Sequence, residues 1–327
     1  MSAVLTIAMA LTGAATTAQT VPTQYAAGHF YATPQTASGQ TLRLIVDTGG
    51  GGTANLYWFT EATAQKLHLV PAGCKLDGHA VKAVTAPVYQ KQAALPPALG
   101  PCAGKVLVNA ENFSYDGQLG ASYLGTRVWT FDYPHQLLRA EGSAWRHDVA
   151  AKPANLGFQK DDTGGVTQYF PRIVMRVDGI PINMLLDTGA TAHPTAAGKA
   201  AAGTETEADG MGVTSYITTR MFDIWHKKHP DWRVVENGDD LLGEQFSARL
   251  IEVPKVQIAG WTVGPIWFTE RPNRAFHKMM ARIMDETPEG AVGGNVLSHF
   301  SITIDYPKAK AWFTCAQGCV AAAPVTK

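Results

Sequence analysis

The chain has 327 residues, of which 46% are hydrophobic and 17% are charged. This composition is typical of a globular protein with a sizeable core. The 27 basic and 27 acidic side chains cancel, so no excess of charge indicates a nucleic acid or an anionic membrane surface as a partner. Binding of nucleic acid is therefore not expected.

The N-terminus carries an uncharged run of apolar and small side chains over residues 4–18, with a plausible cleavage site after Ala18. The run is too short to span a bilayer, and its pattern is that of a signal peptide, although Met1–Ala3 lacks the usual basic residue. We therefore expect residues 1–18 to be removed on export. No later stretch reaches eighteen apolar residues, so we expect no membrane span and a secreted or periplasmic protein.

Four cysteines permit three disulfide pairings in an oxidising compartment: Cys74, Cys102, Cys315 and Cys319. Proximity in the sequence favours Cys74 with Cys102 and Cys315 with Cys319. Only the second pair is close enough in sequence for a metal site, and no histidine lies near it. We expect two disulfides, no metal and no cofactor.

The chain contains an internal repeat. TLRLIVDTGGG surrounds Asp47 and PINMLLDTGAT surrounds Asp187, with a turn glycine eight residues before each aspartate. A second pair of similar segments follows at residues 116–134 and 289–307, each with two glycines, a leucine and a final Asp-Tyr-Pro. Such a repeat predicts two copies of one structural unit.

Between and around these segments lie short runs rich in Val, Ile, Tyr, Phe and Trp, which are typical of strands. Helical patterns at residues 217–229 and 274–286 fall in the second half, where the spacing between the two repeated segments is longer. The sequence therefore predicts a mainly β fold of two pseudo-symmetric lobes with a few helices inserted in the second. The small, polar segment near residues 152–155 sets the expected boundary, giving lobes at 19–152 and 153–327.

The repeated Asp-Thr-Gly has a chemical implication. A carboxylate that follows a buried strand must be compensated by hydrogen bonds, which a threonine hydroxyl and the N–H groups of a glycine turn can supply. Two such sites in duplicated lobes can face each other across a pseudo-twofold axis. Two carboxylates that lie so near each other share one proton, and this state suits hydrolysis of an amide by an activated water.

Leu-Ile-Val-Asp47-Thr-Gly and Met-Leu-Leu-Asp187-Thr-Gly resemble the active-site motifs of the aspartic peptidases of the pepsin and retropepsin clan, in a single-chain bacterial type. The resemblance implies a cofactor-free endopeptidase that cleaves peptide or protein substrates, with the two lobes as acid-protease-like β units. The implied roles are catalysis for Asp47 and Asp187, bracing of the two loops for Thr48 and Thr188, and backbone support of the carboxylates for Gly49 and Gly189. Both lobes lie on one chain, so dimerisation is not required to build the site.

Two features depart from the pepsin pattern. Gly50 and Ala190 follow the Asp-Thr-Gly motifs where pepsin-like enzymes usually have a hydroxyl residue. Without those donors the lower pKa of the pair should be less depressed, which predicts an activity optimum at roughly pH 4 to 6.

The family also has a hairpin flap over the cleft; our candidates are Gly78 and His79 in LDGHAV, with Tyr89 as an alternative lid residue.

A non-enzymatic protein is the alternative. Duplicated β lobes with a groove can bind extended peptides by strand addition, and a catalytically inactive peptidase-like protein would do so. Such a protein would not need an aspartate in both lobes, which favours the enzyme.

Overall fold

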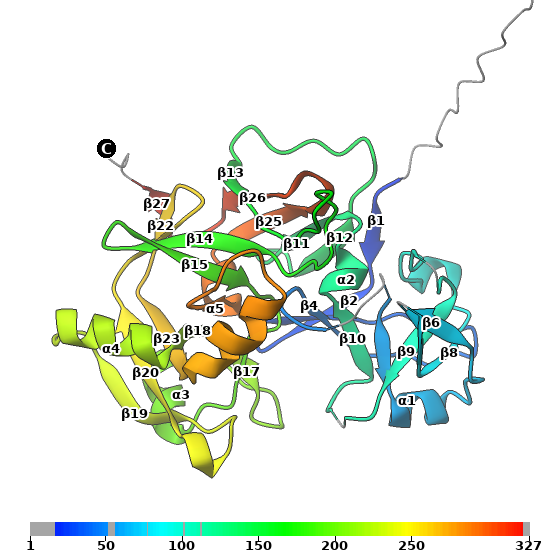
Figure 1. Cartoon of the computed structure of the whole chain (residues 1–327), viewed down its shortest axis with the longest axis horizontal. Helices are drawn as coiled ribbons and strands as arrows, with labels where there is room; N and C mark the ends of the chain where they lie inside the picture. The colour runs from blue at the N-terminus through cyan, green and yellow to red at the C-terminus, as the bar shows by residue number, and fades with distance from the viewer. Residues whose placement is uncertain (1–16, 52–55, 77, 101, 112, 323–327) are drawn as a thin grey trace, which may run out of the picture.

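The computed structural model describes residues 17–322 except 52–55, 77, 101 and 112. The fold is mainly β and consists of two β lobes side by side (Figure 1), which confirms the predicted fold class. Residues 1–16 of the predicted signal peptide lie outside the described residues. Within the described part of the chain, no helix is long and apolar enough to cross a membrane.

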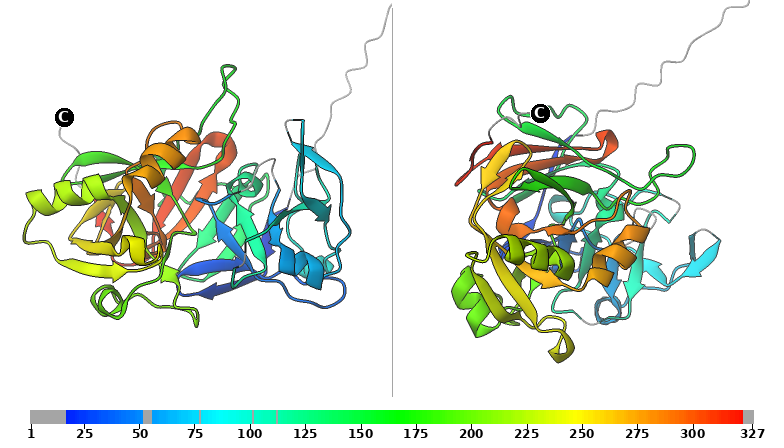
Figure 2. Two further views of the ribbon diagram at one scale, coloured as in Figure 1. Left: turned by 60° about the horizontal axis from the view of Figure 1, so that its bottom comes forward. Right: turned by 60° about the vertical axis from the view of Figure 1, so that its left-hand side comes forward.

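The first lobe is built on a seven-stranded sheet whose strands all come from the first half of the chain. In spatial order they are β2 (Thr23–Ala26), β3 (His29–Ala32), β4 (Leu44–Asp47), β10 (Gly117–Gly120), β5 (Trp58–Thr60), β9 (Lys105–Asn109) and β8 (Ala83–Thr85). A separate hairpin of β6 (Cys74–Leu76) and β7 (His79–Val81) projects from this lobe in both views of Figure 2. The helices of this half are α1 (Glu61–Lys66), a 3-10 turn at Lys91–Ala93 and α2 (Ala121–Leu124).

The second lobe is built on a ten-stranded sheet. Its order is β19 (Val234–Asp239), β20 (Ala248–Val253), β23 (Ile266–Arg271), β18 (Ser215–Thr218), β24 (Gly290–Val292), β15 (Ile180–Leu186), β14 (Arg172–Val177), β21 (Val256–Ile258), β22 (Trp261–Val263) and β27 (Val320–Ala321). A short pair, β16 (Thr191–Ala192) and β17 (Gly212–Val213), stands beside it.

The second half also holds α3 (Ala196–Ala202), α4 (Thr219–Lys228) and α5 (Gly294–Leu297). Helix α4 lies within the helical pattern predicted at 217–229, and the Thr218 side chain caps it by accepting a hydrogen bond from the Met221 N–H. The pattern at 274–286 gives instead a π turn at Ala275–Met279 followed by a 3-10 turn at Met280–Arg282. Further 3-10 turns occur at Glu244–Phe246 and Tyr306–Lys308.

A third sheet joins the two halves. Its six strands are β1 (Gln19–Val21), β12 (Leu137–Ala140), β11 (Val128–Asp132), β25 (Phe300–Asp305), β26 (Lys310–Cys315) and β13 (Lys152–Asn155). Strands β11 and β25 are equivalent in the repeat and pair antiparallel at its centre, where the Thr130 and Thr303 hydroxyls lie 2.7 Å apart. The segment expected to separate the lobes is itself strand β13, paired with β26.

The repeat is visible in the strand pairing. In the first lobe β4 pairs in parallel with β10, and in the second lobe β15 pairs in parallel with β24. A Cβ atom on Gly117 would lie 2.1 Å from the Trp58 carbonyl oxygen, and one on Gly290 would lie 2.0 Å from that of Tyr216. The two glycines therefore allow the same close backbone approach in each lobe.

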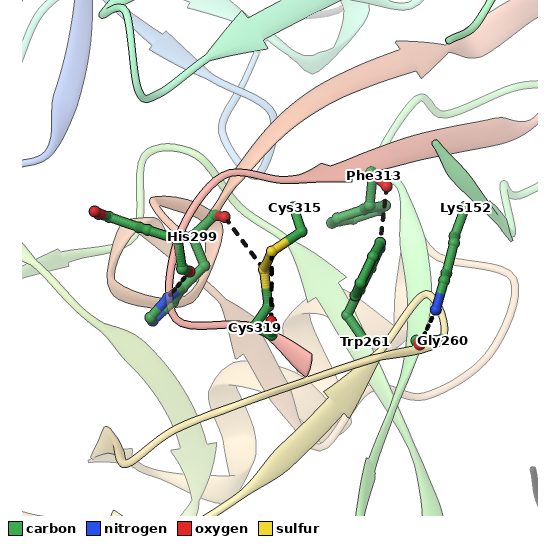
Figure 3. Close-up of a disulfide and its surroundings, with 8 residues drawn as sticks. Lys152, Gly260, Trp261, His299, Phe313, Cys315 and Cys319 are labelled. Carbon is green, nitrogen blue, oxygen red and sulfur yellow. Dashed lines mark hydrogen bonds between the residues drawn. A yellow bond between two sulfur atoms is a disulfide. The ribbon is translucent and has the colours of Figure 1, made fainter. Parts of the chain in front are cut away.

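Two disulfides fix peripheral segments. Cys74, at the start of β6, is bonded to Cys102, 28 residues later. Cys315, at the end of β26, is bonded to Cys319, and the chain then continues into β27 on the second lobe (Figure 3). Near this second bridge the Trp261 indole donates a hydrogen bond to the Phe313 carbonyl, which ties β22 to β26.

Candidate active site

The two Asp-Thr-Gly segments meet where the lobes join. Strand β4 ends at Asp47, and β15 ends directly before Asp187. The three apolar residues directly before each aspartate, 44–46 and 184–186, are buried and hold the strand end against the core. Asp187 is buried and Asp47 is partly exposed.

Thr48 and Thr188 link the two loops. The Thr48 hydroxyl donates to the Leu186 carbonyl, and the Thr188 hydroxyl donates to the Val46 carbonyl, both at 2.7 Å. Each hydroxyl oxygen also accepts from the backbone N–H of the other threonine, at 3.0 and 3.1 Å. All four bonds are buried, so the position of one loop is fixed by the other.

The glycines after the threonines hold the carboxylates. The Gly49 N–H donates to Asp47 Oδ1 at 2.8 Å, and the Gly189 N–H donates to Asp187 Oδ1 at 3.0 Å. A Cβ atom on Gly49 would lie 2.3 Å from Cγ of Asp187, and one on Gly189 would lie 2.3 Å from Cγ of Asp47. Each carboxylate thus packs against the opposite loop, at a distance that no residue larger than glycine permits.

The two carboxyl groups are close enough to affect each other's ionisation. Burial raises the pKa of both, because a low-dielectric environment disfavours the charged form. The pKa of Asp187 is held well above its usual range by burial and then by the neighbouring charge of Asp47. For Asp47, the hydrogen bonds from Asp187, Gly49 and Gly50 oppose part of the effect of burial. Burial therefore favours the neutral form of both carboxyl groups, and the Asp187 carboxyl feels the charge of Asp47 in addition.

Gln118 is a contact of the pair that the sequence analysis missed. Its side chain extends from β10, and its Nε2 donates to Asp47 Oδ2 at 2.8 Å. A Cβ atom on Gly50 would lie 1.9 Å from that oxygen and 2.0 Å from that nitrogen. Residue 50 itself supplies no side-chain donor, and the amide of Gln118 donates to Asp47 from a different strand. The one polar residue in the otherwise apolar Gln-Leu-Gly segment was the available signal.

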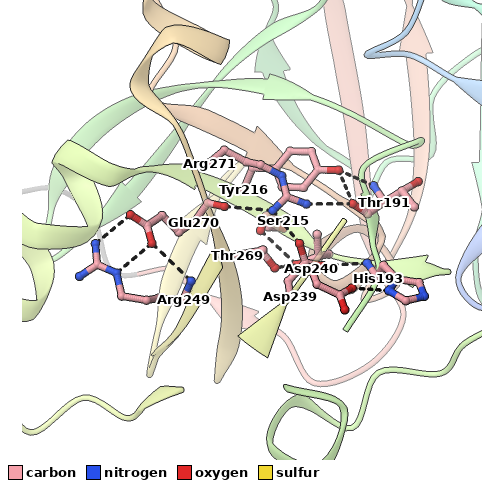
Figure 4. Close-up of polar contacts among 11 residues, drawn as sticks. Thr191, His193, Ser215, Tyr216, Asp239, Asp240, Arg249, Thr269, Glu270 and Arg271 are labelled. Atoms are coloured by element: carbon pink, nitrogen blue, oxygen red, sulfur yellow. Dashed lines mark hydrogen bonds and ion pairs between the residues drawn. The ribbon is translucent and has the colours of Figure 1, made fainter. Parts of the chain in front are cut away.

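The loop that follows Asp187 is anchored by a buried polar network (Figure 4). Arg271 donates to Asp239 at 2.9 Å and to the Thr191 carbonyl at 3.2 Å. The Tyr216 hydroxyl accepts from the Thr191 N–H at 2.7 Å, and the Asp239 carboxylate accepts from the His193 N–H at 2.7 Å. No sequence motif pointed to these residues, because they come together only in the folded sheet.

Residues 192–213, between β16 and β17, reach from this loop to the first lobe. Glu207 of this segment accepts a hydrogen bond from the Tyr31 hydroxyl at 2.6 Å and forms an ion pair with Arg43. His29 Nε2 lies 3.1 Å from the Thr191 hydroxyl, and burial lowers the pKa of this imidazole to about 4. A cavity of about 360 Å³ beside the segment is lined from both lobes, and neither Asp47 nor Asp187 lines it.

The flap candidates occupy a hairpin turn and a position on the core. Gly78 forms the turn between β6 and β7 with a φ of +82°, and His79 beside it is exposed. The Tyr89 hydroxyl lies 3.1 Å from that of Tyr57, and its ring packs against the core. No hydrogen bond or ring contact between described residues joins these three to the pair, so a flap at either place stays a prediction.

Within the ranges that the structure describes, no three His, Cys, Asp or Glu side chains gather in a way that could hold a metal ion. His226 and His229 lie at the end of α4, where His229 contacts Asp178 at 2.6 Å and stacks on Trp232.

The comparisons with known proteins concern mainly the fold. No protein-family model matches the chain, and no curated protein matches its sequence. Among solved structures, the aspartic proteinase from Irpex lacteus aligns over 92% of this chain and 98% of its own, with 11% identity and a TM-score of 0.49. Basic 7S globulin from soybean aligns over 92% and 96%, with 9% identity and a TM-score of 0.42. Similarity at this level establishes no activity.

Proposed function

We propose that this protein is an aspartic endopeptidase of the pepsin and retropepsin clan, with Asp47 and Asp187 as its catalytic pair. The observation that carries the proposal is the reciprocal packing of the two Asp-Thr-Gly loops, in which each carboxylate lies against the glycine of the other loop. If each Asp-Thr-Gly were only a capped turn at the end of a strand, neither the second copy nor the contact between the two loops would be needed.

The chemistry follows from the state of the pair. A water bound between the carboxylates attacks the carbonyl carbon of the peptide bond while Asp47 takes its proton. Asp187 donates its proton to the carbonyl oxygen, which gives a neutral tetrahedral intermediate. The C–N bond then breaks as the proton on Asp47 passes to the leaving nitrogen, and a hydroxyl proton of the intermediate returns to Asp187. The pair thus recovers its starting state with one proton.

The threonine bonds and the glycine N–H groups support this mechanism by fixing the two carboxylates before substrate binds. Preorganised groups need no rearrangement during the reaction, which is the main source of electrostatic catalysis. Two disulfides in a chain with a predicted signal peptide support a secreted or periplasmic location. The lobe division at 152/153 remains part of the proposal.

The test is cleavage of an unstructured protein such as casein, with inhibition by a statine-type transition-state mimic and none by chelators or serine reagents. The competing function is peptide binding without cleavage. Under that alternative, peptides would bind with an affinity that is unchanged by Asp47→Asn, and no pH between 2 and 8 would give products.

A further inference from the structure

The two carboxylates have different surroundings although their loops are nearly symmetric. Gln118 in the first lobe and Ala291 in the second hold equivalent places, one residue after the close-packed glycines of β10 and β24. Gln118 is aligned with Ile45 of β4, and Ala291 with Leu185 of β15, each two residues before the aspartate. The first position supplies an amide donor and the second supplies a methyl group.

The space around the first aspartate is shaped for this amide. Gly50 leaves room for Gln118 Nε2, and any side chain at residue 50 would overlap both the amide and the Asp47 carboxylate. In the second lobe the equivalent place is filled by Ala190, and Ala291 packs in an apolar cluster with Leu185 and Phe276. Glycine at 50 and glutamine at 118 therefore form one arrangement, which the second lobe lacks.

Resting on the proposed function, we infer that Gln118 is a positioning residue that holds the negative charge of the pair on Asp47 and leaves the proton on Asp187. An amide N–H donated to a carboxylate oxygen favours the ionised form of that carboxyl group. Among the residues that the structure describes, no side chain outside the pair donates to Asp187 in this way, so Asp187 retains the proton. The assignment fixes Asp47 as the base that deprotonates water and Asp187 as the group that protonates the carbonyl oxygen.

Other titratable groups do not provide this bias. Tyr115 and Tyr306 are close enough to feel the charge of Asp47, and Tyr133 and Tyr216 are close enough to feel that of Asp187. Burial raises the pKa of all four phenols, to about 12 for Tyr216, so they stay neutral in the pH range of the enzyme. The Gln118 contact is thus the main side-chain difference between the two sides of the pair.

The experiment compares kcat/KM from pH 2 to 8 for the wild type, Gln118→Met and Gln65→Met. Methionine keeps the length of glutamine without its amide, and Gln65 is exposed on α1. Loss of a hydrogen bond to a charged group should move the acidic limb of the Gln118→Met profile up by about one pH unit. The Gln65→Met profile should match the wild type. A Gln118→Met profile that is lowered equally at every pH would overturn the inference, because that is the result of a purely structural role.

A second measurement does not depend on activity or on the folding of the Gln118→Met variant. Carboxyl ¹³C shifts of the wild-type protein, assigned with Asp47→Asn and Asp187→Asn, report which group ionises first as the pH rises. Ionisation of Asp47 first supports the inference, and ionisation of Asp187 first overturns it. If the wild type cleaves no peptide, the proposed function fails, whereas this titration still decides where the charge lies.

Discussion

The link between the two loops can be tested by Thr48→Val, which keeps the shape of the side chain and removes its hydroxyl. The substitution leaves the Leu186 carbonyl and the Thr188 N–H without their partners, both in buried surroundings. Each buried group that loses its hydrogen bond costs about 1–3 kcal/mol, so the free energy of unfolding should fall by about 2–6 kcal/mol. The matched control is Thr48→Ser, which keeps both bonds and loses one buried methyl group, worth about 1 kcal/mol.

The assay is urea unfolding followed by fluorescence of the eight tryptophans, with kcat/KM measured on the same preparations. We expect Thr48→Val to lose both stability and most activity, and Thr48→Ser to retain most of both. Because Thr48 and Thr188 belong to one network, the double variant with Thr188→Val should lose less than the sum of the single losses. Equal unfolding midpoints for Thr48→Val and Thr48→Ser would refute the reasoning that the hydroxyl bonds hold the loops together.

The remaining predictions concern chemistry, pH and the first disulfide. Asp47→Asn and Asp187→Asn should each abolish casein cleavage with an unchanged circular dichroism spectrum, and substantial turnover by either would remove that residue from the pair. The pKa of buried His29 is lowered to about 4 from 6.5, so the unfolded chain takes up its proton first as the pH falls. About 3 kcal/mol of stability should therefore be lost between about pH 6.5 and 4. His29→Gln should flatten this decline in urea midpoints measured at pH 4 and 7, and parallel profiles would contradict it. Replacing Cys74 and Cys102 together by serine opens a 28-residue loop and should lower stability by about 3.5 kcal/mol, measured against the non-reduced wild type.

The two Asp-Thr-Gly loops could be predicted from the sequence because they are local and occur twice. An apolar strand, an aspartate and a glycine turn specify their geometry over about ten residues, and the second copy indicates the pseudo-twofold partner. The β class followed from the same short apolar runs. Helix α4 was also predictable, because an amphipathic pattern, a threonine cap and a following proline mark both of its ends.

Other features depend on contacts between residues far apart in the chain. The six-stranded sheet pairs β1 with β12 and β13 with β26, and no local pattern specifies such partners. For the same reason, the polar character of Gln118 in an apolar segment did not by itself identify Asp47 as its partner, 71 residues away in the sequence. The ion pair of Glu207 with Arg43 likewise joins residues far apart in the chain and arises only when the lobes come together.

The central sheet has a consequence for how such a site can change. Strands β11 and β25 meet as equivalent partners, as identical subunits would at a twofold axis, yet they belong to one polypeptide. In a symmetric pair of identical chains, every substitution enters both sides of the axis at once. Here a single codon alters one side only, so glutamine can stand at 118 while alanine stands at 291. Because both halves lie on one chain, the two carboxyl groups can have different neighbouring side chains.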